Sequence, residues 1–111
     1  MTVEQYHEVL KKFTPKQGLI LNNDWEIVKP LLLGLLTNGK RYGYRSCPCR
    51  PAAGVMEKDR DIVCPCVYAK PDIEEYGACY CWLYVSQDWN ERKVPHVQVL
   101  ERRPVEKILD F

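Results

Sequence analysis

Six cysteines in three closely spaced pairs constrain this chain more than any other feature of its sequence. One residue separates the cysteines of each pair, in Cys47-Pro48-Cys49, Cys64-Pro65-Cys66 and Cys79-Tyr80-Cys81. Cysteines this close together rarely bond to each other, so each pair must direct its sulfurs elsewhere. In a cytosolic chain this pattern favours metal or redox chemistry, whereas in a secreted chain it would favour a disulfide framework.

Length and composition set the limits within which these cysteines act. The chain has 111 residues, of which 46% are hydrophobic, and we expect it to form one domain spanning 1–111. Its net charge of +1 argues against a nucleic-acid binder. The apolar run at 31–36 is too short to span a bilayer, and no basic-then-apolar leader precedes it. We therefore expect a cytoplasmic protein without a membrane segment.

The N-terminal third has the pattern of two amphipathic helices. Thr2 and Gln5 form a capping box before a helix over 3–14. Asn23 or Asp24 can cap a second helix that runs to about Thr37, with Asn38-Gly39 as its stop. Pro30 predicts a kink or a restart inside this second helix.

The sequence after residue 40 has weaker periodicity and more cysteine, proline and glycine. We expect a short helix within 57–66 and another that is capped at Asp72 and closed by Gly77. The residues of 82–85 are typical of a strand, and 105–110 of a last short helix. The fold class expected is therefore a small, irregular, mainly α-helical domain anchored by a metal.

The cysteine spacing narrows the choice of metal. Thiolates suit zinc or an iron–sulfur cluster, and zinc sites usually present Cys-x2-Cys rather than a one-residue gap. A cubane cluster needs four thiolates, which leaves two cysteines able to form a disulfide next to an electron source. Spacing alone does not tell which four of the six would bind the metal. A structural zinc domain and a simple electron carrier therefore remain as alternatives.

Four segments of the chain resemble a known family. "NGKRYGYRSCPCR", "VCPCVY", "YGACYCWLYV" and "ERRP" are similar to the catalytic subunit of ferredoxin:thioredoxin reductase, in particular to the ferredoxin-dependent disulfide reductases of anaerobic archaea and bacteria. The resemblance covers roughly residues 25–105. It implies helices around one [4Fe-4S] cluster, with few or no short strands. It also implies an oxidoreductase that passes electrons from ferredoxin to thioredoxin or a glutaredoxin-like protein.

The resemblance further implies a role for each cysteine. Cys49 and Cys81 would form the redox-active disulfide, with Cys49 attacking the partner and Cys81 bound to the cluster in a one-electron intermediate. The cluster ligands would be Cys47, Cys64, Cys66 and Cys79. A ferredoxin near −400 mV and a thioredoxin near −270 mV differ by about 130 mV, so reduction would be favourable by about 6 kcal/mol.

Proton transfer is where this sequence departs from the family. Plant-type members carry a histidine between the cysteines of the third pair, and this chain has Tyr80. Its phenol can donate a proton to a leaving thiolate, or its ring can simply pack over the cluster. Of the two histidines, we expect His7 to be solvated on its helix, and His96, in a loop, to be able to approach the disulfide.

Basic residues surround the first cysteine pair. Such charges steer an acidic ferredoxin toward the site, or else belong to an ordinary solvated surface. The residues concerned are Lys40, Arg41, Arg45 and Arg50. Whether the chain works alone, as a homo-oligomer or with a second subunit is open from sequence. Because the cysteine loops lack an apolar core of their own, we expect the protein without metal to be largely unfolded.

Overall fold

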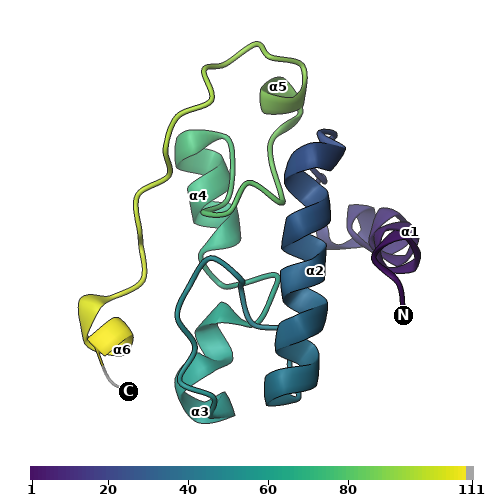
Figure 1. Ribbon diagram of the computed structural model, residues 1–111. Coiled ribbons are helices and arrows are strands. Elements are labelled where there is room, and N and C mark those ends of the chain that lie inside the picture. The colour runs from purple at the N-terminus through teal and green to yellow at the C-terminus, as the bar shows by residue number, and fades with distance from the viewer. Residues whose placement is uncertain (110–111) are drawn as a thin grey trace.

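Helices dominate the backbone of the computed structural model, which describes residues 1–109 (Figure 1). Their order is α1 (Val3–Phe13), the 3-10 helix η1 (Pro15–Gln17), α2 (Trp25–Tyr42), α3 (Met56–Asp59), the 3-10 helix η2 (Arg60–Ile62), α4 (Ala69–Tyr76), α5 (Gln87–Asn90) and α6 (Val105–Leu109). Within the described residues, extended segments pair only through isolated bridges. The predicted mainly helical fold class is confirmed.

Helix α1 begins at the predicted capping box. The Thr2 hydroxyl accepts a hydrogen bond from the Gln5 backbone N–H at 3.1 Å, and the Gln5 side chain accepts one from the Thr2 N–H at 2.9 Å. The helix ends at Phe13, one residue before the predicted end, with Thr14 as its C-cap. Its apolar stripe, which includes the buried Tyr6, packs against α2.

Helix α2 forms the centre of the molecule, with α1 on one side and α3 and α4 on the other (Figure 1). Asp24 caps it by accepting a hydrogen bond from the Glu26 N–H at 3.1 Å, as one of the two predicted caps. The helix continues through Pro30 and ends at Tyr42, so the predicted end near Thr37 is wrong. The helix ends where the backbone turns left-handed, at Gly43, whose φ is 82°.

The core lies where the helices meet the loop that carries the third cysteine pair. Leu32 and Leu35 of α2 are completely buried. They belong to one apolar cluster with Tyr6 of α1 and with Leu83 and Tyr84 of the loop. The best apolar residues of the sequence therefore pack directly against a cysteine loop.

Two of the shorter helices differ from their predicted bounds. The helix expected within 57–66 is divided into α3 and η2 and ends before Cys64, because the backbone is extended at Val63, which bridges to Ser46. Helix α4 starts at Ala69, not after a cap at Asp72. The Asp72 carboxylate is buried inside α4, where it accepts a hydrogen bond from Arg102 at 2.8 Å. Gly77 ends α4 as predicted, with φ at 85°.

The strand-like run at 82–85 does not form a strand. Trp82 has a φ of 68°, which breaks the extended conformation, and only Tyr84 and Val85 make single bridges, to Leu21 and Ala78. Helix α5 was not predicted; its signal is Ser86, whose hydroxyl accepts from the Trp89 N–H at 3.1 Å. Helix α6 was predicted over 105–110, of which position 110 lies outside the described residues.

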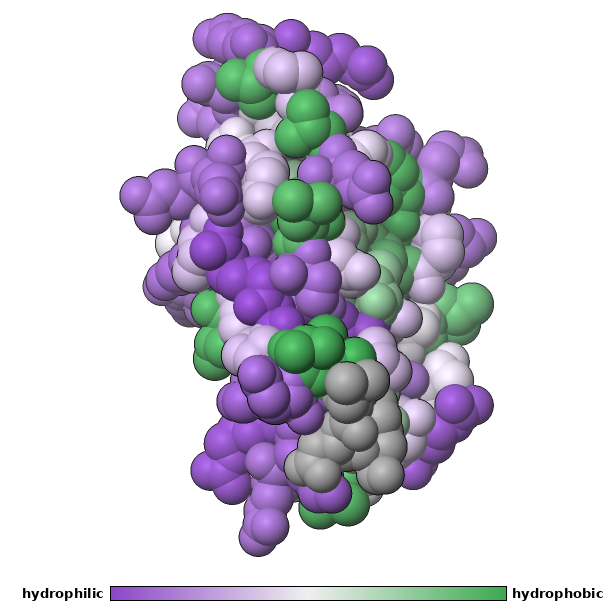
Figure 2. Space-filling view, turned by 90° about the vertical axis from the view of Figure 1, so that its left-hand side faces the viewer, coloured by the Kyte–Doolittle hydropathy of each residue, from purple (hydrophilic) through white to green (hydrophobic). Residues whose placement is uncertain are grey.

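No helix within the described residues is both long and apolar enough to cross a lipid bilayer. The chain after α5 returns along the face of α4 to α6 (Figure 1). On that face, apolar residues are dispersed among polar ones (Figure 2).

Candidate functional site

The first two cysteine pairs lie on neighbouring loops that are joined through their backbones. The Cys47 N–H donates to the Ile62 carbonyl at 2.8 Å, and the Cys64 N–H donates to the Arg45 carbonyl at 2.9 Å. Ser46 and Val63 form an antiparallel bridge between these bonds. The loop after α2 is thus held beside the chain that follows η2. Arg50 of the first loop also contacts Cys66 of the second, which lies 16 positions later in the sequence.

The third pair lies on a tight turn between α4 and α5. The Cys79 N–H donates to the Tyr84 carbonyl at 2.8 Å, and the Tyr84 N–H donates to the Cys79 sulfur at 3.4 Å. Trp82 adopts the left-handed conformation at the corner of this turn. Its carbonyl accepts a hydrogen bond of 2.9 Å from the side chain of the buried Asn22. A segment near α2 therefore fixes the turn from outside.

The first pair can approach α2 because Gly34 has no side chain. A Cβ atom at Gly34 would lie 2.7 Å from the Cβ of Pro48, closer than such atoms approach in proteins. Pro48 stands between Cys47 and Cys49. Any larger residue at position 34 would therefore push this cysteine loop away from the helix.

All six cysteines carry free thiols and lie in one region. The Cys79 and Cys81 sulfurs are 3.9 Å apart. Hydrogen bonds from the Cys47 and Cys81 thiols lower the pKa of Cys49 to about 4. Burial raises the pKa of Cys64, and the negative charges of Cys47, Cys79 and Cys66 raise it further. The thiols are close enough to influence one another's ionisation.

Exposure divides the six thiols. Cys49 is exposed to solvent, whereas Cys47 and Cys79 are buried and the remaining three are half-buried. Cys49 and Cys81 line a pocket of about 470 Å³ together with Tyr80, Trp82, His96, Gln98 and Val99. The other four cysteines do not line it. Two predicted catalytic cysteines and Tyr80 are therefore brought to one opening.

His96 was one candidate for proton transfer, and it lines this pocket. Its ring stacks on that of Trp89, with centroids 3.4 Å apart and planes 3° apart. Its Nε2 lies 2.8 Å from the Trp89 carbonyl oxygen. Because a carbonyl only accepts, Nε2 carries the proton in neutral His96 and Nδ1 has the lone pair. His7, in contrast, packs on Trp25 at 4.6 Å and is half-buried, not solvated as expected.

Arg50 is not the surface charge that the sequence indicated. It is buried at 5% exposure, and its Nη1 donates to the Cys66 sulfur at 3.3 Å. Its Nε donates to both carboxylate oxygens of Glu101, at 3.0 and 2.9 Å. Arg50 therefore cannot steer a partner protein, whereas Lys40 and Arg41 at the end of α2 are exposed.

The segment "ERRP" was part of the family resemblance, but no structural role was predicted for its residues. Each of its charged residues reaches back to an earlier part of the chain: Glu101 to Arg50, Arg102 to Asp72, and Arg103 to Asp61 at 2.9 Å. No local pattern could have revealed these partners, because between 30 and 51 residues separate them from the segment.

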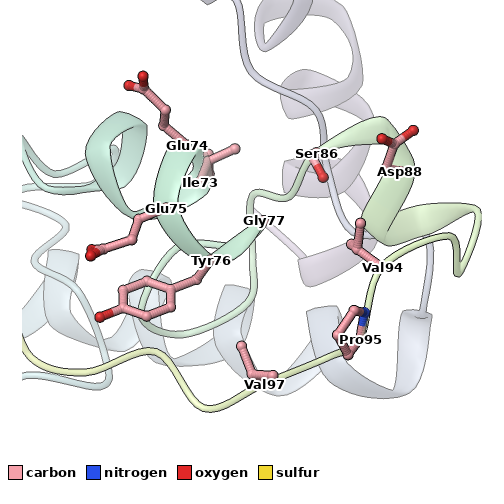
Figure 3. Close-up of a pocket in the computed structure, with 10 residues that line it drawn as sticks. All are labelled: Ile73, Glu74, Glu75, Tyr76, Gly77, Ser86, Asp88, Val94, Pro95 and Val97. Carbon is pink, nitrogen blue, oxygen red and sulfur yellow. The ribbon is translucent and has the colours of Figure 1, made fainter.

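A second pocket, of about 410 Å³, lies at the end of α4 (Figure 3). Its walls come from α4 on one side and from the chain around α5 on the other, with Glu74 and Glu75 pointing outward. It contains no cysteine. The sulfur chemistry therefore belongs to the other pocket.

The donor set suits a soft metal, because thiols predominate in it. As the side chains stand, no three His, Cys, Asp or Glu residues within 1–109 are arranged to hold a metal ion. In the number and type of their ligand atoms, the four cysteines outside the pocket fit an iron–sulfur cluster, which takes four thiolate ligands. They are Cys47, Cys64, Cys66 and Cys79.

A small helical domain with two of six clustered thiols at a pocket belongs to the class of cysteine-based redox proteins. The family model for the ferredoxin thioredoxin reductase catalytic beta chain matches residues 1–108, so the chain belongs to this family. The resemblance predicted from the motifs is confirmed, while the archaeal or anaerobe type stays a prediction. A search of curated proteins found no match. The family points to an iron–sulfur oxidoreductase with ferredoxin and thioredoxin as partners.

Proposed function

We propose that this protein reduces the disulfide of thioredoxin, or of a thioredoxin- or glutaredoxin-like protein, with electrons from ferredoxin. The observation that carries the proposal is the pairing of Cys49 and Cys81 at one open pocket. Cys49 is the exposed member, and a reductase needs one sulfur that a partner protein can reach. Disulfide-reducing chemistry is typical of compartments that keep thiols reduced, and we place the reaction in the cytoplasm.

The remaining cysteines are proposed to hold a [4Fe-4S] cluster. Backbone hydrogen bonds hold the loops of Cys47 and Cys64 side by side, which supports a common centre for the first two cysteine pairs. When bound, the cluster would supply electrons one at a time beside the Cys49–Cys81 pair. The ligands are Cys47, Cys64, Cys66 and Cys79.

Each of three pocket residues performs a different step of the proposed disulfide reduction. The Cys49 sulfur attacks one sulfur of the partner disulfide, and the other partner sulfur leaves as a thiolate that takes up a proton. The Cys81 sulfur then attacks Cys49, which releases the second partner thiol and forms the Cys49–Cys81 disulfide. Two electrons from two ferredoxins and two protons restore both thiols. We propose that the Tyr80 hydroxyl donates a proton in this cycle.

The test is a ferredoxin-coupled assay on anoxically purified protein, preceded by iron and sulfide analysis. We expect about four iron and four sulfide per chain, since a cubane has this composition. Reduction should also expose two further thiols to alkylation while the iron is retained. A zinc protein would contain no sulfide, and a simple electron carrier would gain no thiols.

Two cysteine variants separate the proposed roles. Cys49→Ser should retain iron and sulfide but lose thioredoxin reduction, because the attacking sulfur is removed. Cys64→Ser should lose iron, because its thiol is a proposed ligand. Unchanged thioredoxin reduction by Cys49→Ser would refute the proposed role of the pocket.

A further inference from the structure

The buried guanidinium of Arg50 is the feature that the disulfide chemistry does not explain. The Arg50 side chain is fully buried. Burying a charge is costly unless it is paired and hydrogen-bonded. Its guanidinium carbon lies 4.6 Å from the centre of the Tyr80 ring and 5.1 Å from that of the Tyr68 ring. The residue is thus enclosed by aromatic rings beside the proposed cluster ligands.

Each edge of the guanidinium has a fixed partner. The edge with Nε faces the Glu101 carboxylate, which also lies 2.8 Å from Nη2. The other edge directs Nη1 to the Cys66 sulfur at 3.3 Å. Because the group is planar and rigid, the bond to Glu101 also fixes the direction of Nη1. Arg50 cannot turn away from Cys66 without losing its carboxylate partner.

Two carboxylates lie near the Arg50 guanidinium, and they differ in distance and exposure. Asp72 is a second buried carboxylate, with its Oδ2 at 3.9 Å from Nη2, too far for a hydrogen bond. Glu101, by contrast, is partly open to water, with 23% of its side chain exposed. The positive charge therefore lies between the Cys66 sulfur and two carboxylates, of which Glu101 binds it directly.

We propose that Arg50 is a positioning residue that holds the Cys66 sulfur and raises the reduction potential of the cluster bound there. This inference rests on the proposed function. Potentials of iron–sulfur clusters depend on net charge and on hydrogen bonds to the sulfurs. A fixed positive charge next to a ligand favours the state with one more electron. Glu101 limits the effect by partly neutralising Arg50.

The proposal predicts shifts of opposite sign for the two partners. Arg50→Gln removes the positive charge, so the midpoint potential should become more negative than in the wild type. Glu101→Gln retains a side chain that can accept from Arg50 but removes the counter-charge, so the potential should become more positive. Arg50→Lys keeps the positive charge but loses the planar guanidinium that contacts Glu101 and Cys66 at once. It should shift the potential less than Arg50→Gln does.

The measurement is an anoxic redox titration of the cluster-loaded protein, with iron content determined for each variant. Arg41→Gln is the control: Arg41 is an exposed arginine near the end of α2, so its replacement removes one positive charge without disturbing a buried pair. Its potential should equal that of the wild type.

Two results would overturn the inference. One is an unchanged potential in both Arg50→Gln and Glu101→Gln, and the other is a shift of the same sign in both. If Arg50→Gln does not fold, Glu101→Gln decides by its direction alone. A wild-type protein without iron and sulfide would overturn the proposed function as well, so the two failures are distinguishable.

Discussion

At the scale of single residues, Tyr80 contacts both the cysteine pocket and Arg50. Its position in the sequence indicated only the first of these contacts. It lines the pocket with Cys49 and Cys81, and its ring lies beneath the Arg50 guanidinium at 4.6 Å. Tyr80→Phe preserves the ring and removes only the hydroxyl. We expect it to lower the rate of thioredoxin reduction by roughly 10²-fold, the lower end for a lost general acid. The measurement is the ferredoxin-coupled rate at several pH values.

His96→Gln is the companion variant, because His96 lines the same pocket. If Tyr80 donates the proton, the His96 variant should retain most of the activity. Equal rates for Tyr80→Phe and the wild type across the pH range would remove the acid role from Tyr80. Loss of activity in His96→Gln alone would transfer that role to the imidazole.

The arginines show why residue roles were only partly predictable. Arg45 and Arg50 stand on either side of the first cysteine pair and look equivalent in the sequence. Arg45 lies over the ring of Tyr6 at 4.4 Å, whereas Arg50 is buried between Glu101 and Cys66. The difference depends on a carboxylate 51 residues away. The cysteine motif, in contrast, is local, and it was enough to identify the family.

At the scale of elements, the contact between α2 and the first cysteine loop depends on Gly34. Gly34→Ala would place a Cβ atom 2.7 Å from Pro48, whose ring cannot rotate away. Overpacking of this kind costs about 1–3 kcal/mol, which exceeds or offsets the roughly 1 kcal/mol that alanine contributes to a helix. We expect lower iron content and a lower midpoint of thermal unfolding, measured on anoxic protein.

Gly39→Ala is the control within the same helix. A Cβ atom there would lie 3.2 Å from the Cγ of Arg45, a long side chain that can adjust. Since alanine favours the helix, this variant should keep its iron and be at least as stable as the wild type. Identical behaviour of the two alanine variants would contradict the role given to Gly34.

The starts of α1 and α2 could be predicted from local caps, whereas the equally local cap of α5 at Ser86 was missed, and elements determined by distant partners could not be predicted. Thr2 and Asp24 cap α1 and α2 with their own side chains, and both starts were predicted. Asp72 has the same chemistry, but its carboxylate pairs with Arg102 and therefore does not cap α4. The run at 82–85 has strand propensity, yet the turn that positions Cys79 requires a left-handed Trp82. Tertiary contacts overrode the propensity in both cases.

At the scale of the whole molecule, the last segment ties the chain together through Arg103. This arginine is buried and pairs with Asp61 at 2.9 Å. It also donates to the backbone carbonyls of Pro51, at 3.3 Å, and Lys58, at 3.0 Å. Arg103 therefore joins the C-terminal segment to the region between the first and second cysteine pairs.

Removing either partner of this buried pair should destabilise the protein strongly. Arg103→Met or Asp61→Asn leaves an uncompensated buried group, which costs about 3–5 kcal/mol and lowers the midpoint of thermal unfolding by roughly 10 °C or more. In the double variant neither charge is left alone, so its midpoint should lie well above the value expected from adding the two single losses. Lys11→Met, which breaks an exposed ion pair with Glu8, should leave the midpoint unchanged. Strictly additive losses in the double variant would show that Arg103 and Asp61 act independently. The C-terminal segment would then be held in position by other contacts.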